Sequence, residues 1–194
     1  MSAPFNILGM GWALPRTELD NDFLHKDVGL KKGPDWVASR LGINKRYSVL
    51  SKEYIVKTRN KDPMHAIACA RANGETPVTL AVRAARQAMA QCGVAPEQIG
   101  VVVCNCDIPF DLVPAAANYI AKALGVGSGA HIDMNSACSS FARHMKYLGD
   151  LNDEAWPEFA LTVQTACYTT RTDYSPESFD GYIWGDGAAA QICR

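Results

Sequence analysis

The chain has 194 residues, of which 48% are hydrophobic, and its 19 basic and 20 acidic side chains leave a net charge of −1. This length and composition are typical of one globular domain, so we predict a single domain over residues 1–194. The balanced charge gives no electrostatic reason to expect binding to nucleic acid or to an anionic membrane. No apolar run approaches the roughly 20 residues that span a bilayer, and no targeting segment is recognisable, so we expect a cytoplasmic protein.

Seven cysteines are scattered along the chain, at positions 69, 92, 104, 106, 138, 167 and 193. An odd number of cysteines without a regular spacing predicts free thiols in a reducing compartment and not a disulfide framework. The Cys104-Asn105-Cys106 run has no second pair at the spacing of zinc ligands, so we expect no metal site.

The first part of the chain predicts short elements joined by turns. Residues 5–12 alternate well enough for a first strand, and Asp20 or Asn21 can cap a short helix that follows. Residues 35–42 predict a helix that a glycine ends, with Trp36 and Arg40 four residues apart and therefore on one face. By spacing alone, this pair is a core tryptophan beside a solvated arginine.

The most basic stretch of the chain covers residues 45–75. Its cationic side chains are Lys45, Arg46, Lys52, Lys57, Arg59 and Lys61. We interpret the stretch as an inserted or extended loop. Such a loop is either solvated surface or a patch that receives an acidic partner, and the sequence leaves both possibilities open.

Helices and strands alternate in the rest of the chain. Residues 76–92 predict a helix with one apolar face, because Thr76 and Pro77 open it and apolar residues recur at spacings of three and four. Residues 99–106 form a near-continuous apolar run, which is typical of a strand buried on both faces. A second helix follows Pro114, and a further buried strand is predicted over residues 159–165. This alternation predicts a layered α/β domain.

The stretch from His131 to Phe141 predicts a short strand, a tight turn and then a helix. Cys138 lies where the helix starts, and there the free backbone N–H groups and the helix dipole favour a thiolate over a thiol. Its N–H is also placed to help hold an oxyanion. A buried apolar cysteine is the alternative, which the pattern alone slightly favours. Neither His131 nor His144 is placed to act as a base for this sulfur, so both are predicted to be structural.

Four stretches together carry a family resemblance. They are the Cys138 stretch, the Trp-Gly-Asp-Gly-Ala-Ala-Ala run at 184–190, the Asp-Trp-Val-Ala-Ser-Arg-Leu-Gly-Ile run at 35–43 and the segment 96–125. In their order and spacing along the chain they resemble the amino-terminal half of a ketoacyl-acyl-carrier-protein synthase III, in the thiolase superfamily. The resemblance implies a thiolase-like layered α/β/α domain with a central mixed sheet, which is one half of the usual pseudo-duplicated fold.

The resemblance also implies roles for five residues. Cys138 would be the acyl-accepting nucleophile, Trp36 would stack on the adenine of coenzyme A, and Arg40 would meet its phosphates. Val113 lies in a loop that would reach across a dimer interface, at a place where an aromatic often closes the acyl pocket of the partner, and the smaller side chain implies room for a chain longer or bulkier than acetyl. Trp184 would line the acyl pocket. The implied substrates are thioesters of coenzyme A or of an acyl carrier protein, and no cofactor is expected.

Relatives often carry a second adenine-binding side chain, an arginine, in the loop that here covers residues 168–180. The matching place falls near Ser178-Phe179, and Arg171 is the only arginine of the loop. Carrier-protein donors would depend less on this clamp. The basic stretch 45–75 is a candidate surface for an acyl carrier protein.

Thiolase-like synthases complete the site with a His and an Asn, or a second His, from a carboxyl-terminal half that would begin where this chain ends, at Arg194. We therefore expect a second thiolase-like half, either in a partner chain or in a longer polypeptide, and a dimer or a higher oligomer. The expected context is fatty acid, polyketide or signal-molecule synthesis. The rival function is a non-catalytic scaffold that supports a partner synthase.

Overall fold

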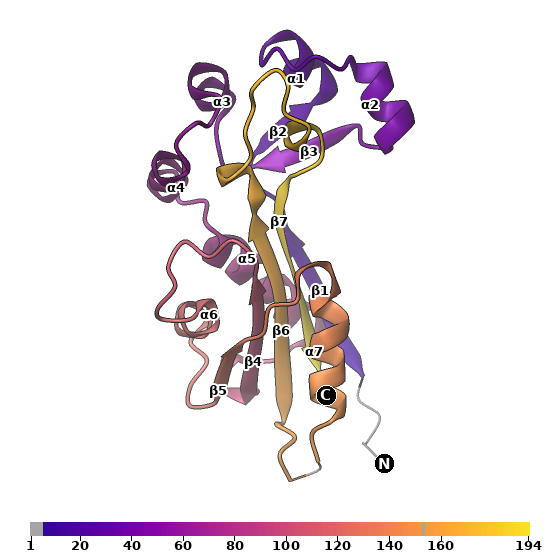
Figure 1. The fold of residues 1–194 in the computed structure, drawn as a ribbon. Helices are drawn as coiled ribbons and strands as arrows, with labels where there is room; N and C mark the ends of the chain where they lie inside the picture. The colour runs from indigo at the N-terminus through magenta and orange to yellow at the C-terminus, as the bar shows by residue number, and fades with distance from the viewer. Residues whose placement is uncertain (1–5, 153) are drawn as a thin grey trace. The chain divides into compact units, whose positions relative to one another are not determined.

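A computed structural model describes residues 6–152 and 154–194 (Figure 1). The chain forms two compact units, each assembled from separate stretches of sequence. The sheet unit comprises residues 1–13, 77–166 and 188–194, and the helical unit comprises residues 14–76 and 167–187. The single domain over residues 1–194 stays a prediction.

The sheet unit is built on a five-stranded mixed sheet. Its strand order is β1-β7-β6-β4-β5, with bounds Ile7–Ala13, Asp186–Cys193, Phe159–Cys167, Ile99–Cys106 and Ala130–Asp133. β1 runs antiparallel to β7, whereas β4 is parallel to both of its neighbours. The strand predicted over residues 99–106 is confirmed with its bounds. The predicted first strand also forms, although Phe5 lies outside the described residues.

Helix α5, Pro77–Cys92, packs directly on strand β1. A Cβ atom added to Gly9 would lie 2.3 Å from the carbonyl oxygen of Ala88, and one added to Gly11 would lie 2.2 Å from that of Ala84. Real side chains do not tolerate such distances, so glycine on the strand and alanine on the helix permit the close approach. Two glutamines of α5 also accept backbone N–H groups of this edge strand, Gln91 from Met10 at 2.6 Å and Gln87 from Trp12 at 2.7 Å.

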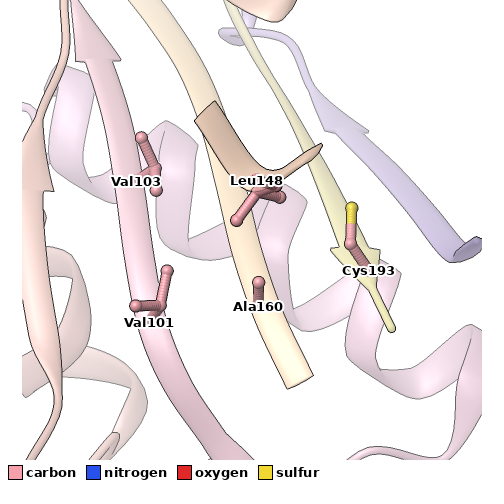
Figure 2. Packing of buried hydrophobic residues seen from close by; sticks show 5 residues of the cluster. All are labelled: Val101, Val103, Leu148, Ala160 and Cys193. Carbon is pink, nitrogen blue, oxygen red and sulfur yellow. The ribbon is translucent and has the colours of Figure 1, made fainter. Parts of the chain in front are cut away.

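Helix α7, Ser140–Gly149, covers strands of the same sheet. Its Leu148 joins a buried cluster with Val101, Val103, Ala160 and Cys193. Leu148 lies in front of the strands in Figure 2, and helical ribbon is visible behind them. Helix α6, Ala116–Leu124, contacts β4, β5 and α5. The expected layered α/β/α arrangement around a mixed sheet is confirmed.

The helical unit contains a two-stranded antiparallel sheet and four short helices. The strands are β2, Thr17–Asp20, and β3, Lys45–Ser48, and the helices are α1, Asn21–Lys26, α2, Pro34–Leu41, α3, Lys52–Thr58, and α4, Pro63–Ala72. Across the described ranges, no helix of the chain is long and apolar enough to cross a membrane.

The prediction of a loop over residues 45–75 is wrong, because this stretch forms β3, α3 and α4. Each helix starts at a polar cap. The Ser51 side chain accepts the backbone N–H of Tyr54 at 3.1 Å, and Asp62 accepts those of Met64 and His65 at 2.9 and 3.2 Å. These caps satisfy N–H groups that a helix start leaves unpaired, which stabilises even short helices.

The buried carboxylate of Asp186 organises the helical unit. It accepts the backbone N–H groups of Val49 and Thr169, each at 2.8 Å, and also the hydroxyl of Thr169. That hydroxyl in turn accepts the hydroxyl proton of Ser48 at 2.8 Å. Burial raises the pKa of Asp186 to about 7. The carboxylate thus holds the end of β3 against the segment that follows β6.

Candidate active site

Cys138 lies in the short turn Ala137–Ser139, directly before α7. The position at a helix start agrees with the sequence prediction. Its side chain is exposed, whereas four of the other six cysteines are buried and two are half-buried. Within the described residues, therefore, Cys138 is not a buried apolar cysteine.

Three hydrogen bonds fix the segment around Cys138 to the carboxyl end of β4. They join the N–H of Met134 to the carbonyl of Cys104 at 2.7 Å, the N–H of Cys106 to Asn135 Oδ1 at 2.8 Å, and the hydroxyl of Ser140 to Asn105 Oδ1 at 2.8 Å. The Ser140 oxygen is buried and also accepts the N–H of Ser136 at 2.8 Å. Buried and satisfied polar contacts rigidify a segment, so the sulfur is held in a defined place.

The backbone at Ala137 is strained. Its φ of +47° lies in the left-handed region, which a residue other than glycine adopts at a cost of about 1–2 kcal/mol. Such strain is typical of functional sites, where the surrounding contacts outweigh it. The neighbouring Ser139 hydroxyl donates to the carbonyl of Ser136 at 2.7 Å and helps close the turn.

His144 supports the turn from inside the sheet unit. Its Nε2 lies 2.9 Å from the carbonyl oxygen of Met134, to which it donates, and its Nδ1 accepts from the Gln164 amide at 3.0 Å. Burial lowers the pKa of His144 and favours this neutral form. Because both ring nitrogens are engaged, His144 is not available as a base for Cys138. Nδ1 of His131 lies 3.3 Å from Asn118 Oδ1, so this ring also has a protein partner.

Trp36 and Arg40 lie one turn apart on α2, as the sequence predicts. The half-buried Trp36 ring meets the edge of Phe179, with centroids 6.4 Å apart and planes at 81°. The Lys32 ammonium lies 5.2 Å from the centroid of the same indole. Arg40 is exposed. The helical unit therefore brings an indole, a second aromatic ring and a cation together.

The two residues assigned to the acyl pocket lie in different units. Val113 is 85% exposed in the segment between β4 and α6 of the sheet unit. Trp184 belongs to the helical unit and stacks on Tyr168, with centroids 4.6 Å apart and planes at 20°. Cys138 and Val113 thus belong to the sheet unit, and Trp36, Arg40 and Trp184 belong to the helical unit.

The sequence alone did not identify the residues that hold or contact these side chains. They are Asn105 and Ser140 near Cys138, Lys32 and Phe179 at Trp36, and Tyr168 at Trp184. One signal was present, because Asn105 is a polar residue inside the apolar run of β4, and a buried polar group needs a partner. Throughout residues 6–152 and 154–194, no three His, Cys, Asp or Glu side chains gather as a metal site would require.

No protein-family model matches the chain. Among the curated relatives, the beta-ketoacyl-(acyl-carrier-protein) synthase III of Rhizorhabdus wittichii is 27% identical over 188 residues, which is 97% of this chain and 51% of that protein. The synthase III of Symbiobacterium thermophilum is 34% identical over 135 residues, which is 70% of this chain and 34% of that protein. The chain spans about half the length, or less, of the curated relatives it matches.

Solved structures agree with these relatives. The priming beta-ketosynthase of the R1128 polyketide biosynthetic pathway has a TM-score of 0.78 and 25% identity, and the match covers 97% of this chain and 49% of that one. The 3-oxoacyl-(acyl carrier protein) synthase III of Pseudomonas aeruginosa has a TM-score of 0.77 and 26% identity, over 99% of this chain and 52% of that one. The chain is therefore a homologue of the beta-ketoacyl-(acyl-carrier-protein) synthases III, with the thiolase fold, and corresponds to about half of such a protein.

Proposed function

We propose that Cys138 accepts an acyl group from a thioester of coenzyme A or of an acyl carrier protein, in the first half-reaction of a ketoacyl synthase III. The observation that carries the proposal is an exposed cysteine on a strained turn that buried hydrogen bonds fix to β4. The names of the relatives support a condensing enzyme of this class.

The proposed step is a thioester exchange at Cys138. The thiolate attacks the thioester carbonyl, the oxyanion forms, and the bond from the carbonyl carbon to the donor sulfur then breaks. The acyl group ends on Cys138 and the donor leaves as a thiolate, which takes a proton from solvent. The backbone N–H of Cys138 is a candidate donor to the oxyanion.

For a coenzyme A donor, we propose that Trp36 stacks on the adenine and that Arg40 meets the phosphates. A planar indole and a guanidinium suit these two groups. Lys32 beside the indole adds a second cation. Phe179 makes a T-shaped contact with the Trp36 ring. It lies in the segment where relatives often carry an arginine. A donor on an acyl carrier protein presents no adenine and would not need this group.

We propose that Trp184 lines the acyl pocket and that Val113 helps close the acyl pocket of a partner chain in a dimer. Valine is smaller than an aromatic residue, so the pocket would accept a chain longer or bulkier than acetyl. Acylation of Cys138 measured with thioesters of increasing chain length tests this assignment. Faster acylation by chains longer than acetyl would support it, and a strict preference for acetyl would contradict it.

Condensation needs groups that we propose come from a second thiolase-like half, as a His and an Asn. This half would follow in the same polypeptide or belong to a partner chain in a heterodimer. Support comes from the sheet unit, where Leu8, Met10 and Trp12 of β1 and Phe141 of α7 are exposed. Large apolar side chains gathered on one unit are typical of a surface that another protein covers. No cofactor is part of the proposal.

Intact-mass spectrometry with peptide mapping of residue 138, after incubation with acetyl- and longer acyl-coenzyme A and with the same acyl groups on an acyl carrier protein, tests the proposed function. We expect the addition of an acyl group in the wild-type chain and its loss from residue 138 in Cys138→Ser. A Cys92→Ser variant is the matched control and should keep the adduct. If position 138 of the wild-type chain stays unmodified, both alone and with a second half, the scaffold function replaces this one.

A further inference from the structure

A second thiol outside the candidate active site is paired with an imidazole. Sγ of Cys69 lies 3.6 Å from Nε2 of His65, one turn earlier on α4. Cys69 is half-buried and His65 is exposed, so small reagents can reach the pair. The spacing of four residues places both side chains on one face of the helix.

Neighbouring groups hold His65 in this orientation. The Tyr54 ring of α3 leans against the imidazole, with centroids 5.3 Å apart and planes at 55°. At the start of α4, Asp62 accepts the backbone N–H of His65 at 3.2 Å. The Tyr54 ring therefore supports the imidazole, and the Asp62 cap supports the backbone that carries it.

The other cysteines do not share this environment. Cys92 has a similar intermediate exposure, but its thiol points to backbone carbonyls, those of Ala88 at 3.3 Å and Met89 at 3.6 Å. Four cysteines are buried, and burial raises the pKa of Cys104, Cys106 and Cys193. An imidazole nitrogen can take up the thiol proton, whereas a carbonyl oxygen only accepts a hydrogen bond from the thiol. Cys69 is therefore chemically distinct from Cys92.

We propose that Cys69 and His65 form a second site of covalent modification, which takes acyl groups from small thioesters. His65 Nε2 accepts the Cys69 proton, the sulfur attacks the carbonyl carbon, and the bond to the donor thiol breaks. The proton on His65 then passes to the departing thiolate, so the exchange consumes no oxidant or other reactant. The proposal rests on the proposed function only for the supply of acyl thioesters.

Site-resolved labelling of the native chain tests this site. Iodoacetamide is used first, because it needs no acyl donor, and peptide mapping then gives a rate for each cysteine. We expect Cys69 to react at least about tenfold faster than Cys92, the size of effect that a positioned base readily supplies. His65→Gln should lower the Cys69 rate several-fold and leave the Cys92 rate unchanged. Equal rates for Cys69 and Cys92 in the wild-type chain, which requires no variant to fold, would overturn the proposal.

The second arm uses S-acetyl-N-acetylcysteamine, a thioester without an adenine, on Cys138→Ser and on Cys69→Ser. We expect acetyl-Cys69 in the first variant and none at position 69 in the second. Acylation of Cys138 alone in the wild-type chain would refute the Cys69 site and leave the proposed function standing. Acylation of Cys69 alone would support the Cys69 site and contradict the proposed function.

Discussion

The contribution of a single residue to the stability of this protein depends on its immediate surroundings, and Asp186 is the clearest case. Burial raises the pKa of Asp186 to about 7, although three donors surround its carboxylate. A carboxyl whose pKa is higher in the folded than in the unfolded chain binds its proton more tightly when folded. Its contribution to stability is therefore full below an unfolded pKa of about 4 and is lost as the pH rises to about 7.

Asp186→Asn isolates this effect, because asparagine is neutral at every pH. Urea denaturation at each pH gives the free energy of unfolding of the variant and of wild type. The difference, variant minus wild type, should rise steadily from about pH 4 to about pH 7, because only wild type loses the Asp186 contribution. Contributions from other groups, His144 among them, cancel in the comparison. A difference between the two proteins that does not change with pH would show that the Asp186 pKa is not raised.

At the scale of elements, the turn before α7 is tied to β4 by side chains that the sequence analysis did not single out. Ser140→Ala would leave Asn105 Oδ1 and the Ser136 N–H without this partner inside the protein. We expect a loss of about 1–3 kcal/mol in the free energy of unfolding and a slower acylation of Cys138, because the turn loosens.

Ser139→Ala is the matched control for that variant. The Ser139 hydroxyl is exposed and bonds only within the turn, to Ser136. We expect a change of roughly 0.5 kcal/mol or less, which is usual for surface substitutions. Equal effects of the two substitutions on stability and on the acylation rate would contradict the role given to the bond between Ser140 and Asn105.

Elements with a strong local signal could be predicted from the sequence, and the others depend on contacts distant in the chain. The apolar run 99–106 predicted β4 with its observed bounds, and glycine correctly marked the end of α2. Helices α3 and α4 were missed because both are short and α3 is rich in charge, although Ser51 and Asp62 were available as caps. The position of Cys138 was predicted, but the positive φ of Ala137 was not, since contacts with β4 impose it.

At the scale of the whole molecule, the comparisons cover nearly all of this chain but about half of the first relatives. Met10 and Trp12 of β1 are 57% and 66% exposed, and their backbone N–H groups are already bonded to glutamines of α5. The backbone N–H groups of Met10 and Trp12 thus have partners, while the two side chains remain exposed to solvent. This face is where we expect a second half to bind.

Met10→Glu combined with Trp12→Glu tests this expectation. Because both side chains are exposed, we expect the double variant to fold and to self-associate less than wild type in sedimentation velocity experiments. It should also fail to bind a second half that wild type binds. Ser128→Glu, a substitution at an exposed polar position of the same unit, serves as the control. Unchanged sedimentation and binding in the double variant would place the second half elsewhere.

The most direct test of the account is a site-resolved rate of acylation in the native chain, obtained by peptide mapping of all seven cysteines after a timed exposure to an acyl thioester. We predict that Cys138 is acylated first, that Cys69 follows, that Cys92 is much slower, and that the four buried cysteines react only after denaturation. If Cys138 reacts no faster in the native chain than the buried Cys104 and Cys167, it is not the acyl-accepting residue.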